Sequence, residues 1–394
     1  MQINNENNVL TIFLEGRIDT NNAAAWEKDI FDCIANEKAD DYVIDAGKLN
    51  YISSAGLRVL MRLRKQLGKS VPVMDVSPEI YDIFETTGFT ELLDVHKKLR
   101  EIDVTGCEKL GEGGNGAVYR IDDDKIVKVY KPWMELSAID RERNFARTAF
   151  VNGIPSVIAY DTVKVGDSLG VMFEMLKSDT LGHAMRDNPD KLMDYVDQYV
   201  ELAKTLHGTH VPAGSFARIQ DVHHEKADNL GKWCSPEEIS VLHSIIDSIP
   251  EADTVTHNDL HPGNIMIQDG ELVLIDMPEV TMGPPICDLT AIFRDMISAP
   301  KTQSGLIEAS VGMPKELILK VGNLFFMKYT GITDPAELEG YYKKLGLLYA
   351  FNVVLMPGSG SKRAMEFGEN IMNNLLRPVV LPNEQAIKGL LHSM

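Results

Sequence analysis

The sequence predicts two domains, a small α/β domain followed by a larger α+β domain built from two lobes. The chain has 394 residues, which is more than one core usually holds. In the first hundred residues, short apolar strands alternate with amphipathic helices, as in an α/β layer with a mostly one-sided sheet. Beyond them, β-rich segments come first and helical periodicity then dominates. We expect domains at 1–102 and 103–394, the second with lobes at about 103–176 and 177–394.

The elements of the first domain follow one another at short intervals. The apolar pattern predicts strands at 9–14, 42–45 and 71–74, and helices at 23–34, 54–67 and 78–86. The first helix should face the core with Ala24, Ile30, Phe31 and Ile34. The second should do so with Leu57, Leu60, Met61 and Leu63.

The turn before the second helix is the most specific part of this domain. With the stretch 14–19 and Asp45, the run Ser53-Ser54-Ala55-Gly56-Leu57 resembles the STAS domain of bacterial anti-sigma factor antagonists. The resemblance implies a regulatory or docking domain for a partner protein. It also implies a switch serine at Ser54, where a phosphate would meet free backbone N–H groups of the helix. Ser53 stands where phosphorylated members often carry Asp. Either serine could instead cap the helix, so cap and switch both stay open.

The second domain begins with a glycine-rich stretch. It fits Gly-x-Gly-x-x-Gly-x-Val, the pattern of the loop that covers ATP phosphates in kinases. The pattern is matched by Gly111, Gly113, Gly116 and Val118. Glycine allows positive φ there and lets backbone N–H groups approach phosphate oxygens. A hairpin signal at 122–124 and a β-rich run at 125–130 follow, whereas a dinucleotide-binding turn would open a helix.

Three charged residues further on are candidates for nucleotide binding. Lys128 alternates with apolar neighbours on a predicted strand and is the natural lysine for the phosphates. Glu142 lies in a charged helix that begins at residue 137, and we expect it to pair with Lys128; an ordinary solvated helix charge is the alternative. Glu174 interrupts the apolar strand 170–176, at the place where kinases connect their lobes and hydrogen-bond adenine through backbone groups.

The most informative stretch runs from His257 to Asn264, with Asp276 twelve residues further on. Its Asp259, Asn264 and Asp276 have the spacing used in phosphoryl transfer from ATP. In that chemistry the first Asp accepts the hydroxyl proton, and the Asn and second Asp hold Mg²⁺. Strands expected at 264–267 and 271–275 would carry both metal ligands on one hairpin. The alternative is a His-Asp cluster that only closes a loop.

Taken in order, these motifs resemble the aminoglycoside phosphotransferase and choline kinase group, the small-molecule branch of the protein-kinase-like fold. The implied fold class is an α/β STAS domain followed by a two-lobed α+β protein-kinase-like domain. In that group, the counterpart of Asp288 is structural and hydrogen-bonds the catalytic loop, and we expect His257 to be structural as well. Asn258 and the run Asp276-Met277-Pro278 depart from regulated protein kinases, as does the missing Ala-Pro-Glu segment.

These departures favour a small-molecule kinase or an atypical one over a regulated protein kinase. With the matched motifs, the resemblance implies an ATP- and Mg²⁺-dependent phosphotransferase that acts on a hydroxyl of a small molecule, with the STAS domain regulating or docking it. The acceptor itself is not identified by any motif. The alternative is a regulatory protein in a pathway of the anti-sigma type. Its kinase unit would then phosphorylate a STAS serine or only sense nucleotide.

Composition narrows the partners and the compartment. The formal net charge is −19 and both domains are acidic, which argues against nucleic acid or an anionic membrane, because both need clustered Lys and Arg. The four cysteines are widely scattered and indicate reduced thiols in a cytoplasmic protein. No signal peptide is evident, and the apolar stretch 347–356 is too short to span a bilayer. We expect the stretch 358–361 to be a loop and no phosphate cradle.

Overall fold

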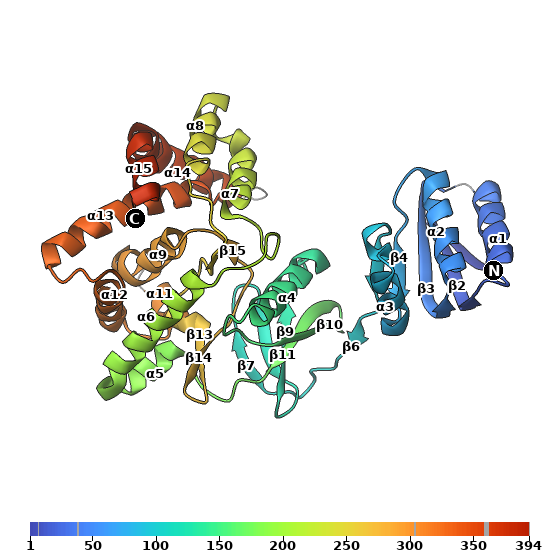
Figure 1. The fold of residues 1–394 in the computed structure, drawn as a ribbon, viewed down its shortest axis with the longest axis horizontal. Helices are drawn as coiled ribbons and strands as arrows, with labels where there is room; N and C mark the ends of the chain where they lie inside the picture. Colours follow the sequence, from blue (N-terminus) through green and yellow to red (C-terminus); the bar gives the residue numbers. More distant parts are fainter. Residues whose placement is uncertain (7, 38, 303–304, 358–361, 394) are drawn as a thin grey trace. The chain divides into compact units, whose positions relative to one another are not determined.

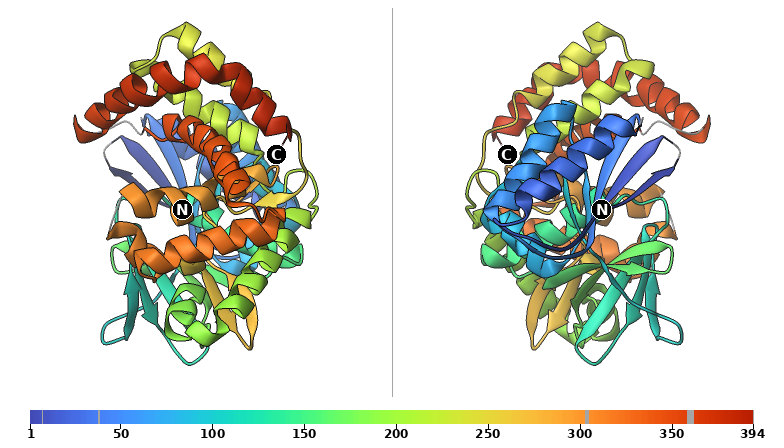
Figure 2. Two further views of the ribbon diagram at one scale, coloured as in Figure 1. Left: turned by 90° about the vertical axis from the view of Figure 1, so that its left-hand side faces the viewer. Right: turned by 90° about the vertical axis from the view of Figure 1, so that its right-hand side faces the viewer.

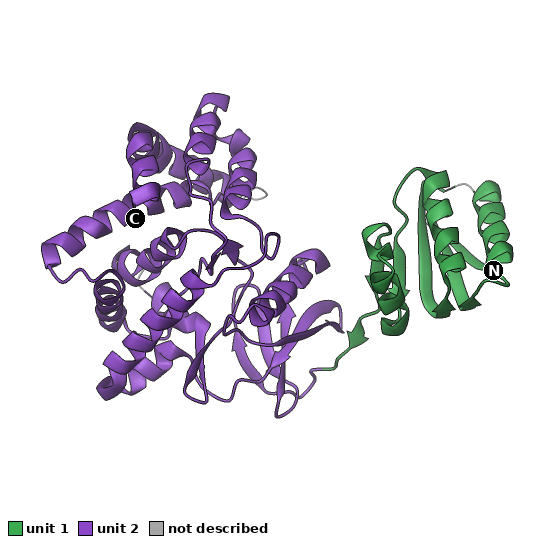
Figure 3. Cartoon of the chain, in the orientation of Figure 1, with its two compact units in different colours: residues 1–103 green, residues 104–394 purple. Residues whose placement is uncertain are grey.

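The computed structural model describes residues 1–394 except 7, 38, 303–304, 358–361 and 394, so the loop expected at 358–361 lies outside the described residues. The chain divides into two compact units, Met1–Asp103 and Val104–Met394 (Figure 3). Each unit has its own hydrophobic core. Within the described part of the chain, every helix falls short of the length or the apolar character needed to cross a membrane.

Unit 1 is built on a five-stranded sheet with the strand order β1-β2-β3-β4-β5 (Figure 1). The first pair is antiparallel and the other pairs are parallel. Its strands are β1 (Gln2–Glu6), β2 (Val9–Ile18), β3 (Asp41–Ile52), β4 (Val73–Val76) and β5 (Val95–Lys97). Its helices are α1 (Ala23–Asn36), α2 (Ser54–Leu67) and α3 (Pro78–Thr86), followed by a short 3₁₀ turn at Phe89–Glu91 and by β6 (Arg100–Glu101). The predicted strands and helices are present, and β1 and β5 are additional.

The predicted core face of α1 is partly wrong. Ala24 is exposed, whereas Ala23 and Ile30 are buried, and Trp26 and Ile34 pack against the same core. The bulky indole of Trp26 shares this stripe, whose spacing of three to four residues is that of one helix face. In α2, Leu57, Leu60 and Leu63 are buried as predicted.

The start of α2 separates the two serines that the sequence left equivalent. Ser53 is the N-cap, and its Oγ accepts a hydrogen bond of 3.4 Å from the Gly56 N–H. Ser54 is the first helical residue and is exposed. A Cβ on Gly56 would lie 2.7 Å from Ile52 Cγ1 and 2.8 Å from Ile18 Cγ2, so the close packing of helix on sheet requires glycine there. Ser53 therefore caps the helix and leaves the hydroxyl of Ser54 available.

Unit 2 begins with an antiparallel sheet in which β10, β11, β9, β8 and β7 are neighbours in this order. The strands are β7 (Lys109–Glu112), β8 (Gly116–Arg120), β9 (Lys125–Tyr130), β10 (Ala159–Val165) and β11 (Ser168–Glu174). Helix α4 (Leu136–Val151) lies between β9 and β10 in the chain and packs on β10 and β11 (Figure 1). The sheet and this helix form the first lobe.

The second lobe is mainly helical, with two short antiparallel sheets of two strands each. One pairs β12 (Val255–Thr256) with β15 (Thr281–Met282), and the other pairs β13 (Ile265–Gln268) with β14 (Glu271–Leu274). The helices before them are α5 (Leu181–Asp187), α6 (Leu192–Gly208), α7 (Ile219–Asp228) and α8 (Pro236–Ile246). Those after them are α9 (Ile286–Phe293), α10 (Ala299–Thr302), α11 (Leu306–Val311), α12 (Lys315–Thr330), α13 (Pro335–Val354), α14 (Lys362–Ile371) and α15 (Glu384–Ser393). Figure 2 shows these helices from two further sides.

Candidate active site

The β13–β14 hairpin positions the two predicted metal ligands at its open end. Its turn residues, Asp269 and Gly270, both have positive φ (53° and 88°), as a two-residue hairpin turn requires. Asn264 ends a 3₁₀ turn directly before β13, and Asp276 follows β14 by two residues. Asn264, expected as the first residue of a strand, therefore lies one residue before β13, and β14 ends one residue earlier than expected. The Ile275 N–H donates to the Asn264 carbonyl (3.0 Å), which holds the two segments side by side.

The segment 257–264, called loop 257–264 below, is anchored by a fully buried carboxylate. Asp288 of α9 accepts hydrogen bonds from the backbone N–H of His257 (2.9 Å) and of Asn258 (2.5 Å). His207 lies 3.0 Å from the same carboxylate through Nε2. The expected contact between Asp288 and the loop is present. Buried carboxylates that accept several hydrogen bonds are held rigidly, so Asp288 fixes the start of the loop to α9.

His257 ties the loop to the segment that leads to Asp276. Its side chain is buried and its Nε2 lies 3.2 Å from the Ile275 carbonyl oxygen, so that nitrogen donates. Asn258 has φ of 63° and donates through its amide to the Glu279 carbonyl (2.8 Å). Both side chains thus make structural contacts, as the sequence suggested for His257.

Asp259, the predicted base, is held through both carboxylate oxygens. Asn264 Nδ2 donates to Oδ2 (2.8 Å), and Arg294 Nη2 donates to Oδ1 (2.6 Å). Burial alone would raise the pKa of Asp259, but its electrostatic interactions with His261 and Arg294 outweigh burial and lower the pKa below its usual range. The carboxylate is therefore ionised at neutral pH, as a proton acceptor has to be.

Arg294 is a site residue that the sequence reading missed. It stands at the start of a π-helical turn, Arg294–Ser298, that continues α9, and it bridges Asp259 and Asp295. A π-turn within a helix often marks a functional position. The available signal was the Arg-Asp pair inside an otherwise apolar run, because charges are kept in apolar helices only when they are paired.

The first lobe contributes Lys128, which meets two carboxylates. Its Nζ lies 2.7 Å from Glu142 Oε1 of α4 and 2.7 Å from Asp276 Oδ1. Burial would lower the pKa of Lys128, but the two carboxylates outweigh it and raise the pKa above its usual value. The expected pair of Lys128 and Glu142 is present, and Lys128 also joins the sheet lobe to the helical lobe. Its part in binding phosphates stays a prediction.

The glycine-rich loop differs from expectation in its conformation. None of Gly111, Gly113, Gly114 and Gly116 has positive φ in the structure. A Cβ on Gly116 would lie 2.1 Å from the Val129 carbonyl oxygen, so this glycine is needed for the close approach of β8 to β9. Gly111 and Gly113 face open space. Val118 pairs with Lys128 across the strands.

Glu174 ends β11, at the connection between the lobes. Its Oε1 accepts from the Ile158 N–H (2.7 Å), and its own N–H donates to the Ile158 carbonyl (3.0 Å). The side chain is thus engaged by the chain itself. A part in adenine binding would fall to the remaining backbone groups of this connection.

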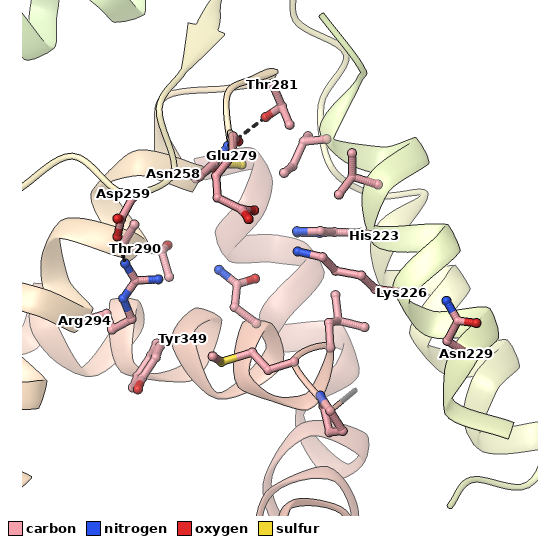
Figure 4. A pocket seen from close by; sticks show the side chains of 18 residues that line it. His223, Lys226, Asn229, Asn258, Asp259, Glu279, Thr281, Thr290, Arg294 and Tyr349 are labelled. Atoms are coloured by element: carbon pink, nitrogen blue, oxygen red, sulfur yellow. Dashed lines mark hydrogen bonds and ion pairs between the residues drawn. The ribbon is translucent and has the colours of Figure 1, made fainter. Parts of the chain in front are cut away.

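A cavity of about 640 Å³ opens beside Asp259 (Figure 4). Its walls come from α7, loop 257–264, α9 and α13, and its volume lies within the range of small-molecule sites. His223 and Lys226 point into it from α7, on the side opposite Asp259 and Arg294. The helical periodicity of these segments predicted the lobe and gave no sign that they would face one cavity.

The pair Asn264 and Asp276 suits a magnesium ion. Nδ2 of Asn264 is fixed by Asp259, which leaves its amide oxygen for a ligand. Oδ1 of Asp276 is paired with Lys128, and Oδ2 has no hydrogen-bond or ion-pair partner among the described residues. Amide and carboxylate oxygens are the ligands that Mg²⁺ prefers. Within the described residues, no cluster of three or more His, Cys, Asp and Glu side chains forms a protein-only cage. A cation here would take its other ligands from water and phosphate.

We expect the charge of Arg294 to set the acid limb of the pH profile. In Arg294→Met/Asp295→Asn the cation beside Asp259 is lost, and the second change avoids an unpaired buried carboxylate. A nearby cation lowers the pKa of a carboxyl group, so its removal should raise the pKa of Asp259. As the pH is lowered, the double variant should therefore lose activity at a higher pH than the wild type does. The measurement is kcat/KM against pH. Asp295→Asn alone keeps Arg294 and should have the same acid limb as the wild type. A shifted acid limb in that variant would contradict the role given to the charge of Arg294.

Comparison with known proteins assigns a family to each of the two units. Residues 106–310, over half of the chain, match the model of the phosphotransferase enzyme family, and residues 1–102 match the STAS domain. BtrV of Bordetella bronchiseptica, which is named as an anti-sigma factor antagonist, is 31% identical over 90 residues, covering 22% of this chain and 77% of that protein.

Two solved structures illustrate the likeness of the larger unit. The streptomycin–ATP complex of APH(2")-IIa is 15% identical, covers 69% of this chain and 92% of its own, and has a TM-score of 0.44. A choline/ethanolamine kinase family protein from Mesorhizobium loti is 14% identical, covers 73% and 92%, and has a TM-score of 0.42.

Proposed function

Because the chain belongs to the phosphotransferase enzyme family, we propose that residues 104–394 transfer the γ-phosphoryl group of ATP to a hydroxyl of a small molecule, with Mg²⁺ as cofactor. The STAS domain would regulate this activity or dock the enzyme to a partner protein. The four free thiols suit a cytoplasmic enzyme.

The groups gathered around Asp259 support the proposal. The ionised carboxylate of Asp259 borders a cavity of about 640 Å³ and is bonded to Asn264, while Lys128 joins Glu142 to Asp276. A base beside an acceptor space, next to a lysine and two oxygen ligands for a cation, is the set of groups that phosphoryl transfer needs.

Each group has a part in this scheme. Asp259 would accept the proton of the acceptor hydroxyl as the oxygen attacks phosphorus, and Lys128, oriented by Glu142, would bind phosphate oxygens. Asn264 and Asp276 would hold Mg²⁺, which offsets the charge of the phosphates. Gly111 and Gly113, which face open space, would let backbone N–H groups reach the phosphates.

A second candidate is that the kinase unit phosphorylates Ser54 of a STAS domain, in the same chain or in another. Ser53 caps α2, so the exposed Ser54 hydroxyl takes no part in the cap. BtrV, similar to this domain, is named as an anti-sigma factor antagonist. Covalent linkage of the domains raises their effective concentration to the order of millimolar where geometry allows contact.

One experiment separates the two candidates. The full chain is incubated with γ-labelled Mg-ATP and a panel of polyols, hydroxy acids and hydroxylated amines, and label is followed in the panel and in Ser54 by mass spectrometry. The proposal predicts label in a panel member, unchanged in Ser54→Ala and lost in Asp259→Asn. Label only on the protein, lost in both variants, would replace it with the second candidate.

A further inference from the structure

The wall of the cavity that faces Asp259 is formed by one face of α7. His223 and Lys226 are three residues apart, a spacing that places two side chains on the same side of a helix. Both line the cavity, and both point into it in Figure 4. Neither residue was assigned a role in the sequence analysis above.

His223 offers a hydrogen-bond donor to the cavity. Its Nδ1 is buried and, among the described residues, has no hydrogen-bond partner. Burial, with the nearby charge of Lys226, lowers the pKa of His223 to about 3, so the ring is neutral and carries one proton. A buried N–H without an acceptor costs more than a bare lone pair, so we assign that proton to Nε2. Nε2–H is then free to donate to a ligand.

Lys226 adds an unused positive charge. The structure gives its ammonium group no hydrogen bond or ion pair with any described residue, and its side chain is exposed. On the opposite side, Arg294 uses Nε and Nη2 for Asp295 and Asp259, and Nη1 has no contact of its own among the described residues. Donors therefore face the cavity from two walls.

We propose that the acceptor carries an oxyanion, a carboxylate or a phosphate, which Lys226 and His223 bind while its hydroxyl faces Asp259. Two donors without a hydrogen-bond or ion-pair partner among the described residues suit an anionic oxygen, and charge-assisted hydrogen bonds are the strong ones. The inference rests on the proposed function, and it names the chemical class of the substrate at the same site.

The cavity has one carboxylate besides Asp259 in its lining. Glu279 lies in the connection between β14 and β15, and its side chain is exposed. A polycationic acceptor needs several carboxylates close together, whereas here one exposed Glu279 faces Lys226, His223 and Arg294. Replacing Glu279 tests directly whether the cavity selects for anions or for cations.

Three probes of one shape separate the charges: D-gluconate, D-glucitol and D-glucamine share their hydroxyl groups and carry a negative, no and a positive charge at one end. Each is titrated calorimetrically into the full chain loaded with Mg²⁺ and a non-hydrolysable ATP analogue. We expect gluconate to bind about ten-fold more tightly than glucitol, and glucamine to bind most weakly. Lys226→Gln should remove the preference for gluconate and leave glucitol unchanged.

Matched variants make the outcome decisive. Lys232→Gln, an exposed lysine beyond the cavity, should keep the wild-type order, and Glu279→Gln should not weaken gluconate. Glucamine binding as tightly as gluconate, no binding of any probe, or a Lys226→Gln chain with unchanged preference would overturn the inference. Binding of the nucleotide analogue is measured in the same experiment. If it persists, only the acceptor class has failed; if it is absent, the proposed function has failed.

Discussion

In Asp259→Asn, turnover should fall by about 10²–10⁴ while the affinity for Mg-ATP stays nearly unchanged. The amide keeps the size of the carboxylate, but it cannot accept the hydroxyl proton. Asn264 and Arg294 lose a charged partner, although Arg294 stays paired with Asp295. The measurements are kcat with a confirmed acceptor and the dissociation constant of Mg-ATP.

The hairpin offers a matched control for this change. Asp269→Asn alters an aspartate at the turn of β13–β14, whose positive φ asparagine also tolerates, and it should turn over as the wild type does. A folded Asp259→Asn protein with wild-type kcat would show that another group accepts the proton. Loss of nucleotide affinity in this variant would place Asp259 at the nucleotide.

Lys128→Met should lower both stability and turnover, for two separable reasons. Glu142 is only 5% exposed, and without Lys128 its carboxylate has lost its cation. Breaking a buried pair in this way costs roughly 3 kcal/mol, which hydrogen exchange of the α4 amides in the full chain would show. Turnover should fall by about 10²–10³, because the phosphates lose a fixed positive charge.

A second change separates the two effects. In Lys128→Met/Glu142→Gln the buried carboxylate is replaced by a neutral amide, so the protection of α4 should return while turnover stays low. Recovery of turnover together with stability would mean that Lys128 acts only by holding the lobe together. Low protection in the double variant would contradict the ion-pair explanation.

Much of the candidate site could be predicted because its residues lie close together in the sequence at a characteristic spacing. Asp259, Asn264 and Asp276 lie within one loop and hairpin, and such local patterns fix local geometry. The strands and helices of unit 1 were likewise visible in the alternation of apolar residues. The strands β1 and β5 were not, since polar residues such as those of Gln2–Glu6 carry no apolar alternation.

The parts that could not be predicted depend on tertiary packing. Arg294 reaches Asp259 across 35 positions of sequence, and His223 faces the same cavity from another helix. The apolar periodicity of α7 and of α9 does not indicate that the two helices line the same cavity. The glycine-rich loop is a similar case. Gly116 is required because the backbone of β9 lies close to it, and the glycine motif alone does not show this contact.

Titrating ATP into the full chain with and without Mg²⁺ distinguishes a metal-dependent phosphotransferase from a nucleotide sensor. Heat reports binding, and ADP formation is followed in the same samples with the panel of hydroxylated acceptors. For a phosphotransferase we expect Mg²⁺-dependent binding and ADP formation that requires both an acceptor and Asp259. Tight binding of Mg-ATP with no ADP formed across the whole panel would contradict this expectation and identify a sensor.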